Sequence, residues 1–453
     1  MKNQRVKALA ALGVVAAVSL ALSGCTGAGG GNGKAADGTT TLTLATPSFS
    51  QMKDMEKLIP KFEESHPGIK VDVTFLEESD LRDAVTKDVA TKGGQYDIVT
   101  IGAYETPIWA KNGWLAELGG YAGSDQGYDV NDIFSPVREG SSYEGKMYSA
   151  PFYAESSFLM YRKDLFEAAG LSMPENPTWD EVSEMAQKLN DPAKNVSGIV
   201  LRGKPGWGES LAPLNTVINT FGGQWYDTSW NAKLDSPEVQ KATQFYVDLL
   251  KTAGQPDPVS YGFSESLNLF TQGKAAMWYD STSAGGVIED PNVSKVAGKV
   301  GYVHAPTTKT KESGWFWSWN LAVPETSKKK DAAWQFISWA TSKDYVQLVG
   351  KEIGWTQVPP GTRNSTYDIP EYLDKAGSFA PITKDIMLAV QPKQPGVAPQ
   401  NWVGVQYVGI PQFQDIGTQI AQGLADTIAG KQDVPTFLKS AQDIAQLAGD
   451  EQK

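Results

Sequence analysis

The sequence predicts an α/β protein made of two lobes. Apolar residues within 41–101 follow strand and helix spacing in the order β-α-β-α-β, with short connections. That order is typical of a parallel sheet covered by helices. A second set of alternating strands and helices begins near residue 158. Because 453 residues are enough for two to three domains, we expect each set to form a lobe with its own core.

In the first lobe the elements follow from the spacing of apolar residues. Strands are expected at 41–46, 69–75 and 97–101, and helices at 51–65 and 81–90. The first helix carries apolar residues three and four positions apart, and a Pro-Gly pair follows it. These elements alone predict a three-stranded parallel unit.

The second lobe shows the same alternation with clearer helix starts. Strands are expected at 158–161, 198–201 and 275–279, and helices at 163–169, 210–221 and 236–253. Another helix follows Thr178, because Glu181 three residues later completes a capping box for its first turn. From residue 371 onward the chain is expected to be mostly helical, with a last helix at 434–448.

Composition excludes several classes of function. The chain has 40 Lys and Arg residues against 52 Asp and Glu residues, a net charge of −12. Such a surface repels phosphate backbones, so nucleic-acid binding is not expected. A single cysteine rules out a disulfide framework and a cysteine-based zinc site. With only two histidines as well, we expect no metal and no cofactor.

The N-terminus predicts secretion and a lipid anchor. A basic start is followed by 15 mostly apolar residues and then by Leu22, Ser23, Gly24 and Cys25. This is the pattern of a signal peptide covering 1–24. The last four residues resemble the bacterial lipoprotein box, in which the cysteine is lipidated; the alternative is an incidental cysteine near a plain cleavage site. Residues 25–40 would hold the lipid and a Gly-rich tether of roughly 20 Å reach.

The residues that follow the predicted strands indicate the kind of ligand. Ligands of open α/β sheets bind outside the carboxyl ends of the strands, and carboxylates, hydroxyls and aromatic rings recur there. Carboxylates accept hydrogen bonds from sugar hydroxyls, and rings cover C–H faces. The mixture therefore predicts a neutral polyhydroxylated ligand in a cleft between the lobes.

Motifs along the whole chain carry a resemblance to a known family. They are KFEE at 61–64, GIKV at 68–71, YDIV at 96–99, NGWLAEL at 112–118, YRKDL at 161–165, GKAAM at 273–277, LAVP at 321–324 and KDAAWQFI at 330–337. In order and spacing they resemble the extracellular solute-binding proteins of carbohydrate ABC importers, the maltose-binding type.

A narrower resemblance is to the binders of sugar alcohols, the mannitol and sorbitol type. It rests on LRGKPGWGE at 201–209, WFWSWN at 315–320, PPGTRNSTY at 359–367, GVQY at 404–407 and IPQF at 410–413. Binders of aldoses share much of this pattern, so a mono- or oligosaccharide ligand stays an alternative.

The resemblance implies the type II periplasmic-binding-protein fold. In that fold two lobes, each a mainly parallel sheet flanked by helices, are hinged by crossing segments and close on the ligand. Carried onto this chain, the crossings fall near 152–158, 303–308 and 353–361. The N-terminal lobe would then be 41–152 with 309–353, and the C-terminal lobe 154–302 with 361–448.

The candidate ligand contacts come from the strand ends, the crossings and the family likeness. They are Ser48, Phe49, Glu78, Tyr104, Glu105, Glu155, Trp207, Glu209, Asp280, Trp315, Trp317, Trp319 and Arg363. The three alternating indoles would share one side of a strand, as a stacking platform or as ordinary sheet core. Trp207 lies between two glycines in a strand-end loop, where it could swing over a ligand or join the core.

Each of the other main candidates could instead have a purely structural role. Tyr104 and Glu105 match the place of sugar contacts in the family, but the same place suits a surface loop. Glu155 matches a sugar-contacting carboxylate, or it could form a salt bridge at the hinge. Asp280 could instead cap a helix. Arg363 could donate to ligand hydroxyls, or it could form an internal salt bridge.

The resemblance implies a lipoprotein that captures a sugar alcohol and delivers it to an ABC importer. Mannitol, sorbitol, arabitol and xylitol are the expected ligands, and the permease subunits are the expected protein partners. We expect a monomer on the extracellular face of the membrane, held by lipid at Cys25 and without enzymatic activity. Two alternatives remain: a secreted glycoside-active enzyme that pairs Glu155 with Asp280 or Glu209, and an adhesin-like lipoprotein.

Overall fold

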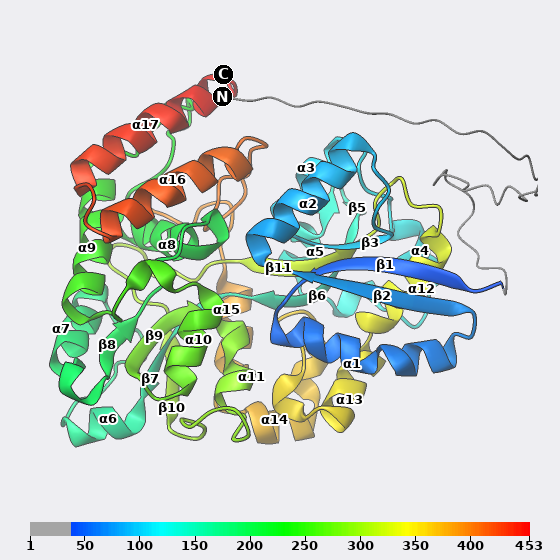
Figure 1. Cartoon of the computed structure of the whole chain (residues 1–453), viewed down its shortest axis with the longest axis horizontal. Coiled ribbons are helices and arrows are strands. Elements are labelled where there is room, and N and C mark those ends of the chain that lie inside the picture. Colours follow the sequence, from blue (N-terminus) through cyan, green and yellow to red (C-terminus); the bar gives the residue numbers. More distant parts are fainter. Residues whose placement is uncertain (1–37) are drawn as a thin grey trace, which may run out of the picture.

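The computed structural model describes residues 38–453, and its two sheets lie side by side in separate lobes (Figure 1). The expected signal peptide, Cys25 and the expected tether as far as residue 37 fall outside the described residues. Among 38–453, no helix combines the length and the apolar character needed to cross a bilayer.

The five strands of the N-terminal lobe form one mixed sheet in the order β2-β1-β3-β11-β6. They are β1 (Thr40–Pro47), β2 (Ile69–Leu76), β3 (Ile98–Gly102), β6 (Ser149–Glu155) and β11 (Trp317–Ala322). β1 pairs in parallel with β2 and β3, as its βαβ connections require, whereas β11 is antiparallel to both of its neighbours.

The C-terminal lobe holds a four-stranded sheet in the order β10-β7-β9-β8. Its strands are β7 (Ser157–Arg162), β8 (Ser197–Val200), β9 (Ala275–Ser281) and β10 (Val300–His304). Only β8 and β9 pair in parallel; β7 is antiparallel to β9 and to β10. In each sheet one strand at a crossing, β11 in the first and β7 in the second, runs opposite to the others, so both sheets are mixed although most of their strands point the same way. A two-stranded ribbon of β4 (Ser142–Tyr143) and β5 (Lys146–Met147) completes the strands.

Helices cover both sheets and carry their apolar faces inward (Figure 1). Those of the first part of the chain are α1 (Ser50–Ser65), α2 (Glu78–Thr91), α3 (Glu105–Lys111), α4 (Gly119–Ser124), α5 (Ser135–Gly140), α6 (Lys163–Ala168), α7 (Trp179–Leu189), α8 (Ala212–Phe221) and α9 (Pro237–Ala253). The later ones are α10 (Phe263–Thr271), α11 (Gly285–Ile288), α12 (Lys330–Ala340), α13 (Lys343–Glu352), α14 (Pro370–Ala376), α15 (Ala380–Ala389), α16 (Phe413–Ile428) and α17 (Val434–Asp450).

The chain crosses between the sheets where the motifs place the hinge. β6 leads into β7 with only Ser156 between them, and residues 305–316 connect β10 to β11. In the third expected crossing the carbonyl of Pro360 accepts a hydrogen bond from the Ala154 amide at 2.9 Å, which ties that segment to the first. The exact limits of the two lobes stay a prediction.

Most expected elements are confirmed within a few residues, and the capping box of α7 forms between Thr178 and Glu181. The helix expected at 210–221 is confirmed as α8, and a π-helical turn at Trp207–Leu211 precedes it. The C-terminal part is mostly helical, as expected, but residues 390–412 between α15 and α16 form no helix. Many prolines, glycines and glutamines in that stretch favour irregular backbone.

Candidate functional site

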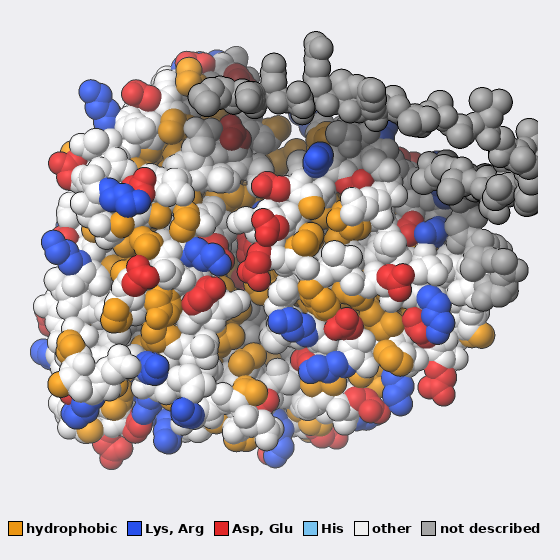
Figure 2. Space-filling view, in the orientation of Figure 1, with side chains coloured by type: hydrophobic (Ala, Val, Ile, Leu, Met, Phe, Trp, Pro, Cys, Tyr) orange, Lys and Arg blue, Asp and Glu red, His pale blue; other side chains and the backbone are white. Residues whose placement is uncertain are grey.

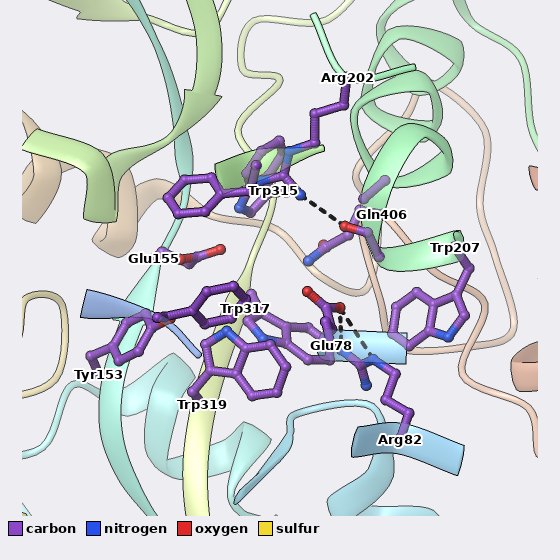
Figure 3. A pocket seen from close by; sticks show the side chains of 14 residues that line it. Glu78, Arg82, Tyr153, Glu155, Arg202, Trp207, Trp315, Trp317, Trp319 and Gln406 are labelled. Carbon is purple, nitrogen blue, oxygen red and sulfur yellow. Dashed lines mark hydrogen bonds and ion pairs between the residues drawn. The ribbon is translucent and has the colours of Figure 1, made fainter. Parts of the chain in front are cut away.

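A small cavity lies between the two lobes, at the ends of strands from both sheets (Figure 3). About 40 Å³ of it is open to the centre of a water molecule. Figure 2 shows acidic side chains gathered on the surface where the lobes meet. The residues that line the cavity are Phe49, Glu78, Arg82, Tyr153, Glu155, Arg202, Trp207, Gly208, Ala212, Phe263, Trp315, Trp317, Trp319 and Gln406.

One wall of the cavity comes from the pairing of β6 with β11. Trp317 lies opposite Glu155 in this antiparallel register, and Trp319 lies opposite Tyr153. Alternation along both strands therefore places all four side chains on one face of the sheet. The indole of Trp317 lies over Gly102 of β3, where a Cβ would come within 1.9 Å of the ring. Glycine at this position makes room for the ring, so the platform expected from the alternating tryptophans lines the cavity.

Trp207 closes the cavity from the C-terminal lobe. It begins the π-helical turn after Gly206, whose φ of +144° favours glycine. The Trp207 indole N–H donates to Oε1 of Gln414 at 2.8 Å, and its ring meets that of Trp317 edge-on at 5.8 Å. Two indoles, one from each lobe, are therefore in contact at the cavity.

Arg82 is the buried cation of the N-terminal side. Its guanidinium carbon lies 4.2 Å from the ring centre of Trp207, with the rings of Trp317 and Trp319 next nearest. It pairs with Glu78 one helical turn earlier on α2, at 2.9 Å, and with Glu105. Burial lowers the pKa of Arg82, but the Glu105 and Glu78 carboxylates outweigh this and hold it above its ordinary value.

Arg202 is the matching cation of the C-terminal side. It donates two hydrogen bonds to Asp280, at 2.9 and 2.5 Å, and a third to the carbonyl oxygen of Gly208 at 2.8 Å. The Asp280 carboxylate also accepts from the Trp278 indole at 3.1 Å and is fully buried. This bidentate arrangement fixes the plane of the guanidinium at the edge of the cavity.

Glu155 is the lining carboxylate that has no arginine hydrogen-bonded to it. It accepts a hydrogen bond from the Ser283 hydroxyl at 2.8 Å. Burial raises the pKa of Glu155 to about 7, and the Ser281 and Ser283 hydroxyls and the Arg202 charge only partly oppose this. Near neutral pH the group can therefore either donate or accept a hydrogen bond.

Tyr153 and Gln406 complete the polar lining. In the described part of the chain, the Tyr153 hydroxyl has no hydrogen-bond partner, so it can serve a molecule in the cavity. Gln406 is held by its own amide, which donates to the Phe316 carbonyl at 2.9 Å and accepts from the Phe316 N–H at 3.3 Å. Within 38–453, no group of three or more His, Cys, Asp and Glu side chains is arranged to hold a metal.

Seven of the expected contacts line the cavity: Phe49, Glu78, Glu155, Trp207, Trp315, Trp317 and Trp319. Of the other carboxylates, Glu105 pairs with Arg82 and accepts from the Gly102 amide, and Asp280 is occupied by Arg202. Glu209 accepts from the Phe263 amide at 3.0 Å. None of these three carboxylates lines the cavity, because buried arginines and backbone amides use their oxygens, and their role as ligand contacts stays a prediction.

Three further expected contacts do not line the cavity. The Tyr104 hydroxyl donates to the Ile410 carbonyl at 3.0 Å and accepts from the Gln414 amide, so it joins the two lobes outside the cavity. Arg363 forms the internal salt bridge weighed as its alternative, with Asp132 at 3.3 Å, and also bonds the Tyr128 and Thr341 carbonyls. Ser48 lines a separate hollow at the surface.

Seven lining residues were not predicted: Arg82, Tyr153, Arg202, Gly208, Ala212, Phe263 and Gln406. Two of them carry a signal in the sequence. Tyr153 is two residues from Glu155 and so shares its face of a strand, and Arg82 follows Glu78 at helical spacing. Arg202 stands in a strand-end loop that had been singled out for Trp207. Gln406 has no local signal, because it comes from the irregular stretch before α16.

The raised pKa of Glu155 predicts a pH-dependent stability. Between pH 4.5 and 7 the Glu155 carboxyl keeps its proton in the folded protein but releases it in the unfolded chain. The free energy of unfolding therefore falls as the pH rises through this range. The Glu155→Gln variant lacks this loss. Its free energy of unfolding, measured by denaturant titration without ligand, should gain about 3 kcal/mol on the parent protein between pH 5 and pH 8. A difference that stays constant with pH would contradict the assignment.

Comparisons with known proteins agree with this architecture. Residues 46–347 match the bacterial extracellular solute-binding protein family. Over 408 residues the chain is 44% identical to a mannitol-binding protein of Pseudomonas aeruginosa, covering 90% of this chain and 92% of that one.

Two solved structures are similar along nearly the whole chain. An ABC transporter solute-binding protein of Agrobacterium vitis with bound D-mannitol is 50% identical, with a TM-score of 0.89 and coverage of 91% of this chain and 99% of that one. Another from Agrobacterium radiobacter, in complex with ribitol, is 28% identical, with a TM-score of 0.80 and coverage of 90% and 98%. These matches confirm the expected type II binding-protein fold. The chain belongs to the bacterial extracellular solute-binding protein family.

Proposed function

We propose that this protein captures an uncharged acyclic polyol between its lobes and delivers it to an ABC importer. A hexitol such as mannitol or sorbitol is the preferred ligand, with the pentitols arabitol and xylitol as shorter relatives. The observation that carries the proposal is the cavity between the lobes, in which indoles face two arginines and a carboxyl group with no arginine bonded to it. The likeness to a mannitol-binding protein and to a mannitol complex supports it.

The lining offers what a polyol needs. The indoles of Trp207, Trp317 and Trp319 cover C–H groups, while Arg82 and Arg202 can donate to hydroxyl oxygens. Hydrogen bonds to charged groups contribute about 1.5–3 kcal/mol each, and a micromolar dissociation constant needs about 8 kcal/mol. A few such bonds and stacked rings suffice even after the ordering costs of closure.

The small volume favours a single linear polyol over an oligosaccharide. An oligosaccharide would need an open groove, whereas both lobes meet around this cavity. Ligand contacts from both lobes favour the closed form, because only a difference in affinity shifts a conformational equilibrium.

We also propose that the protein releases its ligand unchanged. The carboxylate pairs weighed for glycoside hydrolysis join Glu155 to Asp280 or to Glu209, and neither partner lines the cavity. Asp280 is neutralised by Arg202, so it is poorly placed to act as a nucleophile. Turnover of a glycoside by the purified protein would contradict this part of the proposal.

The protein is further proposed to be a lipoprotein on the extracellular face of the membrane. The support is the lipoprotein box that ends at Cys25, the only cysteine of the chain. Its partners would be the permease subunits of the importer, and it would act as a monomer.

A ligand panel tests the proposed function. Mannitol and sorbitol should raise the melting temperature and bind with micromolar or tighter dissociation constants in calorimetry, because binding to the native state stabilises it. Arabitol and xylitol should bind more weakly, since they make fewer contacts. Tight binding of glucose or maltose, with no binding of any polyol, would refute the choice of ligand.

Removing an indole should weaken binding. Trp207→Ala and Trp317→Ala should each raise the dissociation constant for mannitol at least tenfold, about 1.4 kcal/mol, because a stacking surface is lost. Trp230→Ala is the matched control: this ring packs on Tyr226 and Trp402, away from the cavity, and its loss should leave the affinity unchanged. Equal affinities of all three variants would count against the stacking role.

Replacing the cysteine should release the protein from the membrane. Cys25→Ser removes the only thiol that can carry the lipid, and stable anchoring needs acyl chains. In cell fractionation the variant should leave the membrane fraction, while its affinity for mannitol stays that of the parent. Recovery of the variant in the membrane fraction would overturn the anchoring proposal.

A further inference from the structure

Two hollows meet at the same pair of aromatic rings. The inner one is the ligand cavity described above. The outer one lies at the surface between the lobes, with about 310 Å³ open to the centre of a water molecule. Phe49 and Phe263 line both of them. The remaining residues of the outer hollow are Ser48, Ser50, Lys53, Ser264, Leu267, Asn268, Thr271, Gln272, Val287 and Val293.

The two rings come from opposite lobes and meet edge-on. Phe49 follows β1 in the N-terminal lobe, and Phe263 is the first residue of α10 in the C-terminal lobe. Their ring centres are 5.8 Å apart and their planes are inclined by 80°. Both side chains are half-buried, as expected of rings with one side toward each hollow. The pair therefore divides a continuous interlobe space into an inner and an outer part.

Each ring is held in place by its own lobe. Phe49 rests against Trp319, with ring centres 5.6 Å apart. Phe263 has its N–H bonded to Glu209 at 3.0 Å and its ring 5.1 Å from the guanidinium carbon of Arg202. Since nothing joins the two rings covalently, separation of the lobes would part them and closure would bring them together. The contact between them thus depends on the closed state.

A second contact between the lobes lies near the same place. The side-chain amide of Gln51 donates a hydrogen bond to the Ser283 carbonyl at 3.2 Å. The Ser283 hydroxyl in turn donates to the Glu155 carboxylate in the inner cavity. The lobes are therefore closed at this side of the ligand cavity. Here the rings of Phe49 and Phe263 separate the inner cavity from the outer hollow.

We propose that Phe49 and Phe263 form a gate that sets the length of the ligand. With the rings in contact, the inner cavity admits a free polyol and excludes a polyol that carries a sugar unit at one end. This inference rests on the proposed function and names the specificity of the same site. The outer hollow is the larger of the two, and it carries hydroxyl and amide groups that could bond a sugar unit. The two rings stand between the inner cavity and this hollow, because they line both of them.

The test compares mannitol with maltitol, a hexitol that carries one glucosyl unit. The parent protein should bind maltitol at least 100-fold more weakly than mannitol in calorimetry. Phe49→Ala should improve the affinity for maltitol at least tenfold, while mannitol loses a few-fold because one ring contact is removed. Phe263→Ala should shift the ratio in the same direction, so the test does not depend on one variant.

The matched control is Val293→Ala. Val293 lines only the outer hollow and is 53% exposed, so its truncation should change neither affinity. If either phenylalanine variant binds mannitol but keeps the parental ratio of the two affinities, the gate is refuted. It is equally refuted if the parent protein binds maltitol as tightly as mannitol. Failure of the parent protein to bind any polyol would instead overturn the proposed function.

Discussion

The site depends on the neutralisation of two buried arginines. Arg82 and Arg202 lie on opposite sides of the cavity, and an arginine buried without a carboxylate would cost several kcal/mol. Each therefore recruits acids: Glu78 and Glu105 for Arg82, and Asp280 for Arg202. These pairs fix the guanidinium planes and the loops that carry them. The indoles then pack on the fixed cations, as the close approach of Arg82 to Trp207 shows.

This pairing explains why only some of the acids expected as ligand contacts line the cavity. Strand ends were the right places to look, since Phe49, Trp207 and the three alternating tryptophans all line the cavity. The sequence also carried enough periodicity to place most strands and helices. What it could not reveal is which carboxylates face a ligand and which face an arginine. Asp280 and Arg202 are 78 residues apart, and no spacing rule connects them.

Long-range partners also hold the expected contacts that lie away from the cavity. Arg363 is held by groups more than 200 residues earlier, at Tyr128 and Asp132, so its loop is tied to the N-terminal lobe. Tyr104 reaches across to the backbone before α16, in a stretch whose irregular path has no periodicity to recognise. By contrast, Tyr153 could have been found from its alternation with Glu155. Local patterns thus predict faces, while partners between distant segments set roles.

The same neutralisation argues for an uncharged ligand. Arg82 and Arg202 already have their charges matched, so an anionic ligand would have to compete with built-in carboxylates for them. A cationic ligand would find Glu155, but burial raises the pKa of this group to about 7 and so weakens its charge near neutrality. A neutral molecule with many hydroxyls meets neither obstacle, because each hydroxyl can both donate and accept. It can bond to the free edges of the paired arginines and to Glu155 without separating any ion pair.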